Sequence, residues 1–402
     1  MKKIILTNQH VDNRGDESAT IGAIKSLRNF FGQDTEISIY LQSGIKYKFL
    51  PDYCMVNEKP MIIGAFGILE MFIWIIFKLI KIDIQCVCSY QFKAFIADHE
   101  SSDIVISSCG GPYIGDIYIN HEFIHIMHLA VPLLLHKKIT FFAPSMGPFH
   151  NKFMNYFRKK ILKRADLIIL RDEISYKYVQ TFLNKNKGIY LTADACLADE
   201  LKLDKINKTP NTIGITPLDY IYPQSNNKSE MKSDYVKIIV YVLDKLMEQN
   251  TELRVEFFPQ LFAKHTDLPF INKIINKMKY PERTFIFSDR KSGREQQIEI
   301  SALDYMIANR YHSAIFACKT YTPVVCIVYE HKAKAFMESV NLGDYCLNIY
   351  DLNARDLLER INSLEINSSE IRSKLPSKMQ ELHNVANRTA ELIYNFATKN
   401  QL

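Results

Sequence analysis

Apolar runs with the length of buried strands alternate with helical patterns along the whole chain. The runs lie at residues 3–7, 36–41, 103–107, 139–143, 165–170, 189–192, 212–215, 253–258, 284–287, 307–309 and 324–328. Most of them precede a segment with apolar residues three or four positions apart, which is the spacing of one helix face. Strands that alternate with helices in this way predict doubly wound α/β domains with parallel sheets.

A polar linker at residues 199–211 interrupts this alternation near the middle of the chain. A chain of 402 residues is long enough for two domains. We therefore expect an N-terminal domain at residues 1–203 and a C-terminal domain at residues 204–375. In the remaining segment, 376–402, residues 377–396 have the pattern of one amphipathic helix, which could cross back to the first domain.

Residues 61–84 form a long, nearly continuous apolar segment, MIIGAFGILEMFIWIIFKLIKIDI. Its length is about that of a bilayer-spanning helix, but Glu70 in the middle and Lys78 near the end oppose a true span. Two alternatives stay open. The segment could lie in a membrane interface as a peripheral contact, or it could form a pair of helices buried beneath the sheet.

The composition of the chain indicates which classes of ligand it can bind and in which cellular compartment it works. The formal net charge is +6 and the basic residues are scattered, which favours small anionic ligands or a membrane surface over nucleic acid. None of the eight cysteines forms a CxxC pair, and the N-terminal apolar run is too short for a signal peptide. We expect a cytoplasmic protein with reduced thiols, located at the inner face of the plasma membrane if residues 61–84 bind lipid.

The main candidate site lies within residues 300–334, where Arg310 and His312 follow an apolar run. If a strand closes at residues 307–309 and a helix begins near Ser313, both side chains lie where open α/β sheets place their ligands. The helix N-terminus adds positive potential for an anion, and histidine can exchange a proton near neutral pH. The alternative is that Arg310 is a surface charge and His312 a core residue.

A second candidate loop follows the first strand. It begins at Asn13 and places Gly15 in a turn, with Asp16 and Glu17 at the start of the next helix. A strand, a glycine turn and a helix together form a common ligand-binding arrangement in α/β folds. The two carboxylates could equally serve only the helix cap and dipole.

Three further loops carry glycines or charges after a predicted strand. Gly110 and Gly111 follow the strand at 103–107, with Asp116 beyond them, and paired glycines allow a ligand to approach the backbone, although a plain turn is the alternative. Arg171 ends the strand at 165–170, and Asp194 follows the strand at 189–192.

The sequence HEFIH at residues 121–125 has the spacing of a zinc-binding helix, with two histidines on one face. A catalytic zinc needs a third protein ligand, and no convincing one follows, because His128 lacks the rest of the extended pattern. We expect no metal here, and a helix at 121–135 packed on the sheet instead.

Taken in order, these stretches resemble the polysaccharide pyruvyl transferase family. The matching segments are NRGDE (13–17), CGGPYIGD (109–116), MGP (146–148), RADLIILRDEIS (164–175), TADAC (192–196), ALDYMIANRYHS (302–313) and VYEHK (328–332). They cover residues 1 to about 342. The resemblance implies two Rossmann-like domains facing a cleft, similar to the B-type glycosyltransferase fold, with the acceptor side in the first domain and the donor side in the second.

The resemblance further implies a transferase of exopolysaccharide or capsule biosynthesis. Its donor would be phosphoenolpyruvate, used as a co-substrate with no other cofactor. Its acceptor would be a sugar of a cell-surface polysaccharide or of a lipid-linked precursor, and the products would be a pyruvate ketal and phosphate. The sequence leaves the acceptor sugar and the oligomeric state open.

Residue roles follow from the same resemblance and from the chemistry. A donor with a carboxylate and a phosphate calls for two arginines, one from each domain. The donor-binding candidates are Arg171, Arg310, Ser313 and Lys332. The catalytic candidates are His312 as general acid and Asp16 or Asp194 as base. The candidate acceptor or loop residues are Asn13, Gly15, Glu17, Gly110, Gly111 and Asp116.

Two other functions are compatible with this sequence. One is a nucleotide-sugar-dependent glycosyltransferase of the same two-domain form, which would retain a nucleotide and not phosphoenolpyruvate. The other is a non-catalytic protein that recognises anionic glycans and binds its ligand intact.

Overall fold

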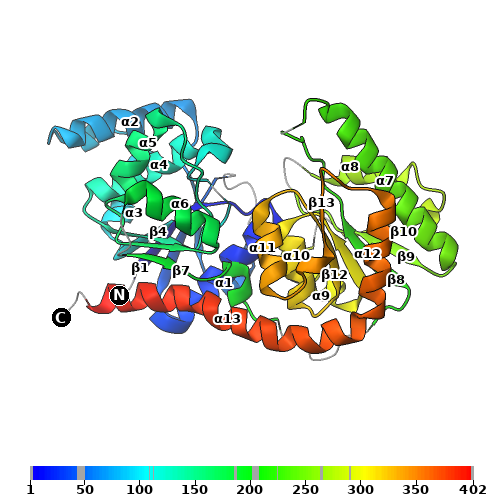
Figure 1. Ribbon diagram of the computed structural model, residues 1–402. Coiled ribbons are helices and arrows are strands. Elements are labelled where there is room, and N and C mark those ends of the chain that lie inside the picture. The colour runs from blue at the N-terminus through cyan, green and yellow to red at the C-terminus, as the bar shows by residue number, and fades with distance from the viewer. Residues whose placement is uncertain are drawn as a thin grey trace. The chain divides into compact units, whose positions relative to one another are not determined.

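The computed structural model describes residues 3–42, 50–107, 109–111, 113–184, 188–201, 208–223, 225–262, 266–288 and 291–399 (Figure 1). The chain divides into two compact units. Unit 1 comprises Met1–Val11, Asp16–Asp199 and Leu382–Leu402, and unit 2 comprises Asp12–Gly15 and Glu200–Glu381. The expected boundary between residues 203 and 204 lies outside the described residues.

Unit 1 is built on a parallel sheet with the strand order β3-β2-β1-β4-β5-β6-β7. Its strands are β1 (Lys3–Gln9), β2 (Glu36–Leu41), β3 (Asn57–Pro60), β4 (Ile104–Ser107), β5 (Lys138–Phe142), β6 (Leu167–Leu170) and β7 (Ile189–Leu191). Its helices are α1 (Arg14–Phe31), α2 (Ala65–Leu79), α3 (Tyr90–Glu100), α4 (Ile119–Leu134), α5 (Lys152–Leu162) and α6 (Glu173–Leu183). The strand order reverses between β1 and β4, which is where such sheets bind ligands.

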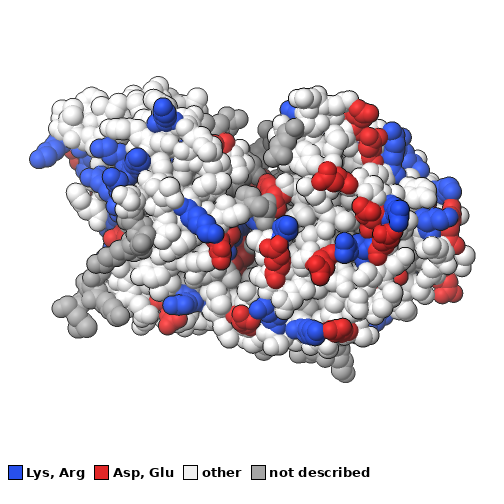
Figure 2. Space-filling model, viewed as in Figure 1, with Lys and Arg blue, Asp and Glu red and all other residues white. Residues whose placement is uncertain are grey.

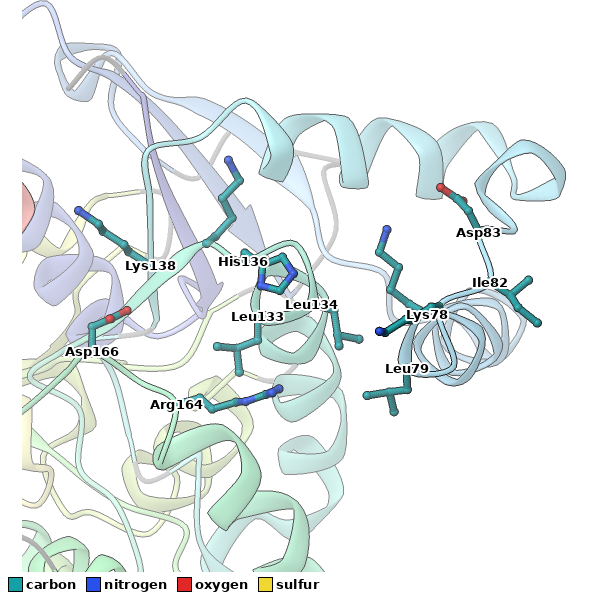
Figure 3. Close-up of a pocket in the computed structure, with 12 residues that line it drawn as sticks. Lys78, Leu79, Ile82, Asp83, Leu133, Leu134, His136, Lys138, Arg164 and Asp166 are labelled. Carbon is teal, nitrogen blue, oxygen red and sulfur yellow. The ribbon is translucent and has the colours of Figure 1, made fainter. Parts of the chain in front are cut away.

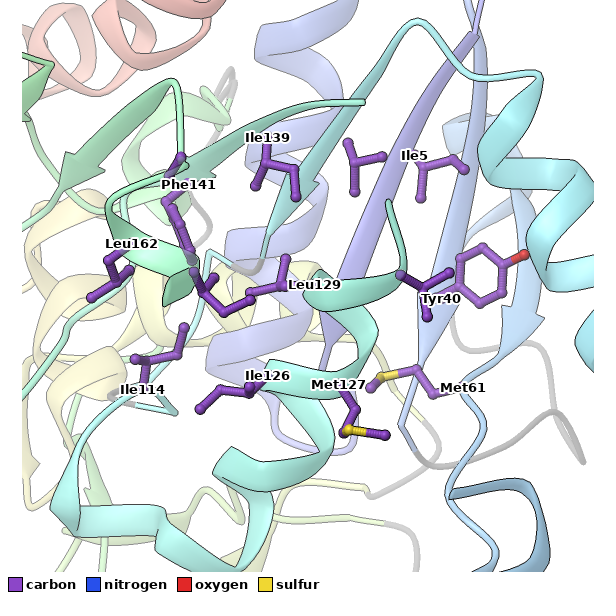
Figure 4. Close-up of a cluster of buried hydrophobic side chains, with 14 of the residues drawn as sticks. Ile5, Tyr40, Met61, Ile114, Ile126, Met127, Leu129, Ile139, Phe141 and Leu162 are labelled. Atoms are coloured by element: carbon purple, nitrogen blue, oxygen red, sulfur yellow. The ribbon is translucent and has the colours of Figure 1, made fainter. Parts of the chain in front are cut away.

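Short apolar strands supply the core of unit 1. Figure 4 shows Ile5 of β1, Tyr40 of β2 and Phe141 of β5 in this core, together with Met127 and Leu129 of α4. All of these side chains are buried. A parallel sheet is covered on both faces, so its strands are apolar at nearly every position, as β4 (IVIS) illustrates.

Unit 2 has the same architecture, with the parallel strand order β10-β9-β8-β11-β12-β13. Its strands are β8 (Thr212–Thr216), β9 (Arg254–Phe257), β10 (Thr284–Ile286), β11 (Tyr305–Ala308), β12 (Val324–Val328) and β13 (Cys346–Asn348). Its helices are α7 (Lys228–Gln249), α8 (Leu268–Ile275), α9 (Gly293–Ala302), α10 (Tyr311–Lys319), α11 (His331–Ser339) and α12 (Ala354–Ile366). The order reverses between β8 and β11.

The last helix, α13 (Ser368–Lys399), begins at Ser368 rather than at residue 377, and it contains Pro376. Its residues from Leu382 onward belong to unit 1. There the Thr389 hydroxyl lies 2.7 Å from that of Thr192, and Asn387 Oδ1 accepts a 2.7 Å hydrogen bond from the Ser26 hydroxyl. The end of the chain is therefore part of the packing of unit 1.

Two parallel α/β sheets confirm the predicted fold class, and most strand positions agree with the predictions. The expected start of the helix in the main candidate site was wrong. Helix α10 begins at Tyr311 rather than near Ser313. His312 consequently lies inside the first turn of α10, and Arg310 occupies the position just before the helix.

Within residues 61–84 the structure has a single long helix, α2. Trp74 is 1% exposed and Met71 is fully buried, whereas Phe66 is 76% exposed and Phe72 is 41% exposed. The alternative of a buried helix pair is therefore wrong, because α2 buries one face and leaves the other apolar face in solvent. Among the described residues, no helix is both long and apolar enough to cross a membrane.

The HEFIH segment lies in the first part of α4, and its glutamate, Glu122, forms an ion pair within unit 1. Glu122 makes a paired contact with Arg158 of α5, because its two oxygens accept bonds of 2.7 Å from Nε and Nη2. Glu122 and Arg158 are both fully buried. His128 Nε2 accepts the N–H of Ile62 at 3.0 Å. In the described part of the chain, no group of three or more His, Cys, Asp or Glu side chains is arranged to hold a metal ion.

We predict that Glu122→Gln destabilises the protein by about 3–5 kcal/mol, because it removes the fully buried one of the two carboxylates that pair with the buried Arg158 guanidinium, the other being Asp116. The urea midpoint of unfolding measures this cost. Glu173→Gln is the matched control, since Glu173 forms only an exposed pair with Lys177 and should change stability by ~0.5 kcal/mol or less. Equal urea midpoints for the two variants would show that the buried pair stabilises the protein no more than the exposed pair does.

Candidate functional site

The turn between β11 and α10 lies at the point where the strand order of unit 2 reverses. Asn309 fixes this turn through three bonds. Its N–H donates to Thr216 Oγ1 at 3.1 Å, its Nδ2 donates to the Ile327 carbonyl at 2.9 Å, and its Oδ1 accepts from the Tyr235 hydroxyl at 2.5 Å. These partners belong to β8, β12 and α7. The bonds therefore fix the position of the backbone from Asn309 to the start of α10.

Ser313 completes this turn rather than facing outward. Its hydroxyl lies 2.8 Å from Thr216 Oγ1 and donates to the Arg310 carbonyl at 2.7 Å. The side chain is fully buried. Ser313, predicted as a donor-binding residue, thus has a local structural role that accounts for its contacts.

Arg310 is held at one end of its guanidinium group. Its Nη2 donates to Asp267 Oδ1 at 2.5 Å, and the arginine side chain is 15% exposed. Asp267 Oδ2 in turn accepts the backbone N–H groups of Gln260 and Leu261 at 2.8 and 2.9 Å. Arg310 Nε is buried and has no hydrogen-bond partner among the described residues. The arginine is therefore oriented by Asp267 while part of its donor capacity is unused.

His312 packs directly against Gly15, which lies in the first turn of α1 rather than in the turn expected before the helix. A Cβ atom added to Gly15 would lie 2.0 Å from His312 Nδ1, so only glycine allows this approach. The start of α1 is stabilised locally, because Asn13 Oδ1 accepts the N–H of Gly15 at 2.8 Å. The structure thus brings the predicted residues Asn13 and Gly15 next to the predicted acid.

Arg14, which was not among the predicted site residues, anchors the segment 12–15 in unit 2. Its fully buried guanidinium donates to the carbonyl oxygens of Pro259, Ser288 and Lys291 at 3.1, 3.0 and 2.9 Å. Its backbone N–H also donates to the Gln260 carbonyl at 3.0 Å. An arginine between asparagine and glycine has no apolar periodicity that would reveal such burial.

Lys332, at the start of α11, is less available than predicted. Its Nζ lies 2.8 Å from Glu330 Oε2 and above the Tyr311 ring at 5.6 Å from the centroid. The glutamate neutralises much of the charge that the lysine would offer to a phosphate group.

In unit 1, two of the predicted residues are partners of one another. Arg171 Nη1 donates to Asp194 Oδ2 at 2.6 Å, and both side chains are buried. Arg171 Nε donates to Ser145 Oγ at 2.9 Å, and Asp194 Oδ1 accepts the N–H of Cys196 at 2.8 Å. Both oxygens of Asp194 are therefore occupied, which makes it a poorer candidate base than Asp16.

Asp16 lies at the reversal point of the sheet in unit 1, in a chain of contacts that includes two histidines. Its Oδ2 accepts from the Tyr113 hydroxyl at 3.1 Å. The Tyr113 ring stacks on His10 with centroids 3.9 Å apart, and His10 Nε2 lies 3.1 Å from His125 Nε2. Burial, together with the neighbouring His121, lowers the pKa of His10 to about 3, so this ring is neutral at physiological pH.

Tyr113 and His10 were missed because each is a single aromatic residue in a loop, where no sequence periodicity marks it. The predicted residues Gly110 and Gly111 belong to the same loop after β4, and the Gly111 carbonyl accepts the N–H of Tyr113 at 2.8 Å. Glu17, in the first turn of α1, is buried.

Asp116 lies apart from these contacts, in the network of Arg158. Its Oδ1 accepts from Arg158 Nη2 at 2.8 Å, and its Oδ2 accepts the N–H of His150 at 2.5 Å. Its observed contacts hold a loop of unit 1 and do not join the residues around Tyr113.

Two parallel α/β units, each with polar residues at the reversal point of its sheet, define a protein of the B-type glycosyltransferase architecture. Residues 13–331 match the model of the family described as polysaccharide pyruvyl transferase. The chain belongs to this family, and the resemblance stated from the sequence motifs is confirmed.

Individual relatives agree with this assignment. The amylovoran biosynthesis protein AmsJ of Erwinia amylovora is 20% identical over an alignment of 298 residues, and the match covers 71% of this chain and 71% of AmsJ. HepE of Anabaena, solved with UDP-glucose, is similar in fold, with a TM-score of 0.62 and 12% identity over 100% of this chain and 99% of its own. The UDP-GlcNAc 2-epimerase of Neisseria meningitidis, bound to UDP-GlcNAc, has a TM-score of 0.59 and 9% identity over 99% and 100% of the two chains.

We predict that Gly15→Ala displaces the His312 ring, because the new methyl group would occupy its position. The expected result is a shifted His312 side-chain NMR resonance, assigned with His312→Gln, and a stability loss of about 1–3 kcal/mol from overpacking. Gly64→Ala is the control, since a Cβ there meets nothing within 4 Å. An unmoved resonance in Gly15→Ala would contradict the close packing of Gly15 and His312.

Proposed function

We propose that this protein transfers a pyruvyl group from phosphoenolpyruvate to a sugar of a cell-surface polysaccharide or of its lipid-linked precursor. The product is a pyruvate ketal, and phosphate is released. Family membership and the relative named for amylovoran biosynthesis support a transferase of polysaccharide biosynthesis. One observation gives the main support for a reaction of this donor. His312, a residue that can deliver a proton, packs against Gly15 and lies two residues after Arg310, whose guanidinium group is oriented by Asp267.

The donor requires groups that hold two anionic ends. Arg310 offers a planar guanidinium group that is oriented by Asp267 and retains an unused, buried Nε. Planar forks of this kind suit carboxylate and phosphate groups. The N-terminal end of α10 adds the positive end of a helix dipole at the same place. We assign the donor to unit 2 on these grounds.

The reaction needs one proton delivered to carbon and one leaving phosphate. A first sugar hydroxyl attacks the central carbon of phosphoenolpyruvate as a proton is added to the methylene carbon, which becomes a methyl group. A second hydroxyl then forms the other ketal bond while the carbon–oxygen bond to phosphate breaks. The two sugar hydroxyl groups release two protons in total. One of them replaces the proton that was delivered to the methylene carbon, and the other is taken up by the released phosphate. We assign proton delivery to His312.

The sugar hydroxyl must lose its proton to a base. We propose Asp16 for this role, because Asp194 has both oxygens engaged by Arg171 and Cys196. Arg171 can bind the donor only if it gives up part of its contact with Asp194 for a contact with the donor. We therefore consider Arg171 a weaker donor-binding candidate than Arg310. The predicted acceptor or loop roles of Asn13, Glu17, Gly110, Gly111 and Asp116, and the donor role of Lys332, stay predictions.

We predict that Arg310→Lys weakens phosphoenolpyruvate binding by at least about tenfold, because lysine keeps the charge but loses the planar fork. His312→Gln should leave donor affinity nearly intact and lower turnover by about 10²–10⁴-fold, because glutamine cannot deliver a proton at neutral pH. Direct titration of phosphoenolpyruvate and phosphate release with a panel of lipid-linked and nucleotide-linked sugars measure both effects.

Arg355→Lys is the control for this experiment, because Arg355 forms only an exposed pair with Glu359 on α12. Normal turnover by His312→Gln would place the acid elsewhere. Unchanged donor binding by Arg310→Lys would remove the proposed donor site. Binding of UDP-sugars in place of phosphoenolpyruvate would favour the glycosyltransferase alternative.

We further propose that α2 makes a peripheral contact with the cytoplasmic face of a membrane. Its apolar side chains Phe66, Leu69, Phe72, Ile76 and Leu79 are exposed. An exposed apolar helix face next to basic residues is typical of interfacial helices. In Figure 2, Lys and Arg side chains gather beside α2 and over α5.

The test replaces Phe66 and Phe72 with serine, and it leaves Trp74 in place because that residue belongs to the core. We expect the double variant to lose co-sedimentation with vesicles containing phosphatidylglycerol while its melting temperature stays close to that of the wild-type protein. Tyr241→Ser, at an exposed aromatic of unit 2, is the control. Absence of vesicle binding by the wild-type protein would eliminate the membrane contact.

A further inference from the structure

An apolar groove runs along unit 1 between α2, α4 and α5. Its volume is about 340 Å³, within the range of ligand sites. Phe72 and Ile75 of α2, Phe123 and Ala130 of α4, and Tyr156 of α5 line it. The groove is open on its outer side to solvent, so its walls could accept a flexible apolar chain without any change of the core.

A basic cavity of about 740 Å³ lies in the same unit. It is lined by the cationic side chains Lys78, Lys81, Lys137, Lys138 and Arg164, and by His136. Figure 3 shows that Lys78 and Leu79 approach from α2, whereas His136, Lys138 and Arg164 approach from the opposite wall.

Two carboxylates also face this cavity, and both have partners in the backbone. Asp83 Oδ1 accepts the N–H of Gln85 at 2.8 Å, and Asp166 Oδ2 accepts the N–H of Ile139 at 2.8 Å. Lys137 is engaged as well, because its Nζ donates to the Ser102 carbonyl at 3.0 Å. The remaining cations still outnumber the carboxylates, so the cavity favours an anion.

The groove and the cavity adjoin one another and share part of their lining. Leu79, Leu133, Leu134 and Arg164 line both of them. Arg164 therefore stands where an apolar wall meets a basic one, and in Figure 3 its side chain extends toward the space between α4 and α2. A ligand that fills both spaces must be apolar along its length and anionic at one end.

We propose that this surface is a binding site for a single phosphorylated lipid. The apolar chain lies in the groove, and the phosphate or diphosphate group lies in the basic cavity beside Arg164 and Lys138. Arg164 is the residue best suited to hold the phosphate oxygens, because its planar group can donate two parallel hydrogen bonds. That this lipid carries the sugar acceptor rests on the proposed function, whereas the binding itself does not.

The experiment titrates the full-length protein with dodecyl phosphate below its micelle concentration, with dodecanol and inorganic phosphate as half-ligands. We expect dodecyl phosphate to bind at least about tenfold more tightly than either half-ligand, because only it fills both spaces. Equal binding of inorganic phosphate and dodecyl phosphate would overturn the proposal, since it would reduce the site to a free-phosphate site.

Two sets of variants locate the site. Lys138→Gln with Arg164→Gln should weaken dodecyl phosphate binding at least about tenfold, and Ala130→Trp should do the same by filling the groove. If the Lys138→Gln and Arg164→Gln double variant does not fold, the double variant Lys78→Gln with Lys81→Gln provides the same test, because these two lysines line the other wall of the cavity. The control, Lys237→Gln with Lys334→Gln, removes two exposed lysines of unit 2 and should bind normally.

Unchanged binding by the folded cavity and groove variants would overturn the site. Phosphate release from phosphoenolpyruvate with a water-soluble sugar acceptor separates this outcome from failure of the proposed function. The cavity variants should keep that activity, because none of the substituted residues lies at the reversal point of either sheet. Loss of it in these variants would show that the cavity affects the reaction other than through lipid, and would also count against the proposal.

Discussion

The buried guanidinium of Arg14 determines how the candidate donor site is built. A charge without solvent contact is tolerated only when polar partners compensate it, and here carbonyl oxygens at three positions of unit 2 accept from the two terminal nitrogens of Arg14. The segment 12–15 is consequently fixed to unit 2, although it lies near the N-terminus of the sequence. Gly15 is thereby held against His312, so the position of the proposed acid depends on Arg14, a residue almost 300 positions earlier in the sequence.

Arg158, Arg171 and Arg310 differ in the completeness of their pairing. Arg158 is fully buried and faces both oxygens of Glu122, and Arg171 is paired with Asp194 and Ser145. Breaking such contacts costs several kcal/mol, because a charge is left uncompensated. Arg310 differs, since one end is oriented by Asp267 while its buried Nε is unsatisfied. The side chain of Arg310 is also 15% exposed, against 1% for Arg171, so a ligand can reach Arg310 more readily.

The sheets were predictable from the sequence because each strand is a short apolar run that ends at a polar loop. The same patterns placed Arg310 and Asp194 at strand ends, and the motifs that carried the family resemblance lie at those ends. Arg14, Tyr113 and His10 were not predictable in this way. Their positions depend on contacts between residues far apart in sequence, such as His10 with His125 or Arg14 with Ser288. Periodicity records which face of an element is buried, and it contains no information about a single side chain in a loop.

Helix α2 shows the same limit for a continuous apolar segment. When nearly every residue is apolar, the pattern no longer says which face is buried, so Trp74 and Phe72 were equivalent in the sequence. The structure buries Trp74 against Phe92, with ring centroids 5.7 Å apart, and leaves Phe72 on the wall of a groove. A helix that only had to cover the sheet would gain nothing from apolar residues on its outer face, since solvent there favours polar side chains. The apolar outer face and the basic residues beside it are therefore best explained together, by a partner that is itself apolar and anionic.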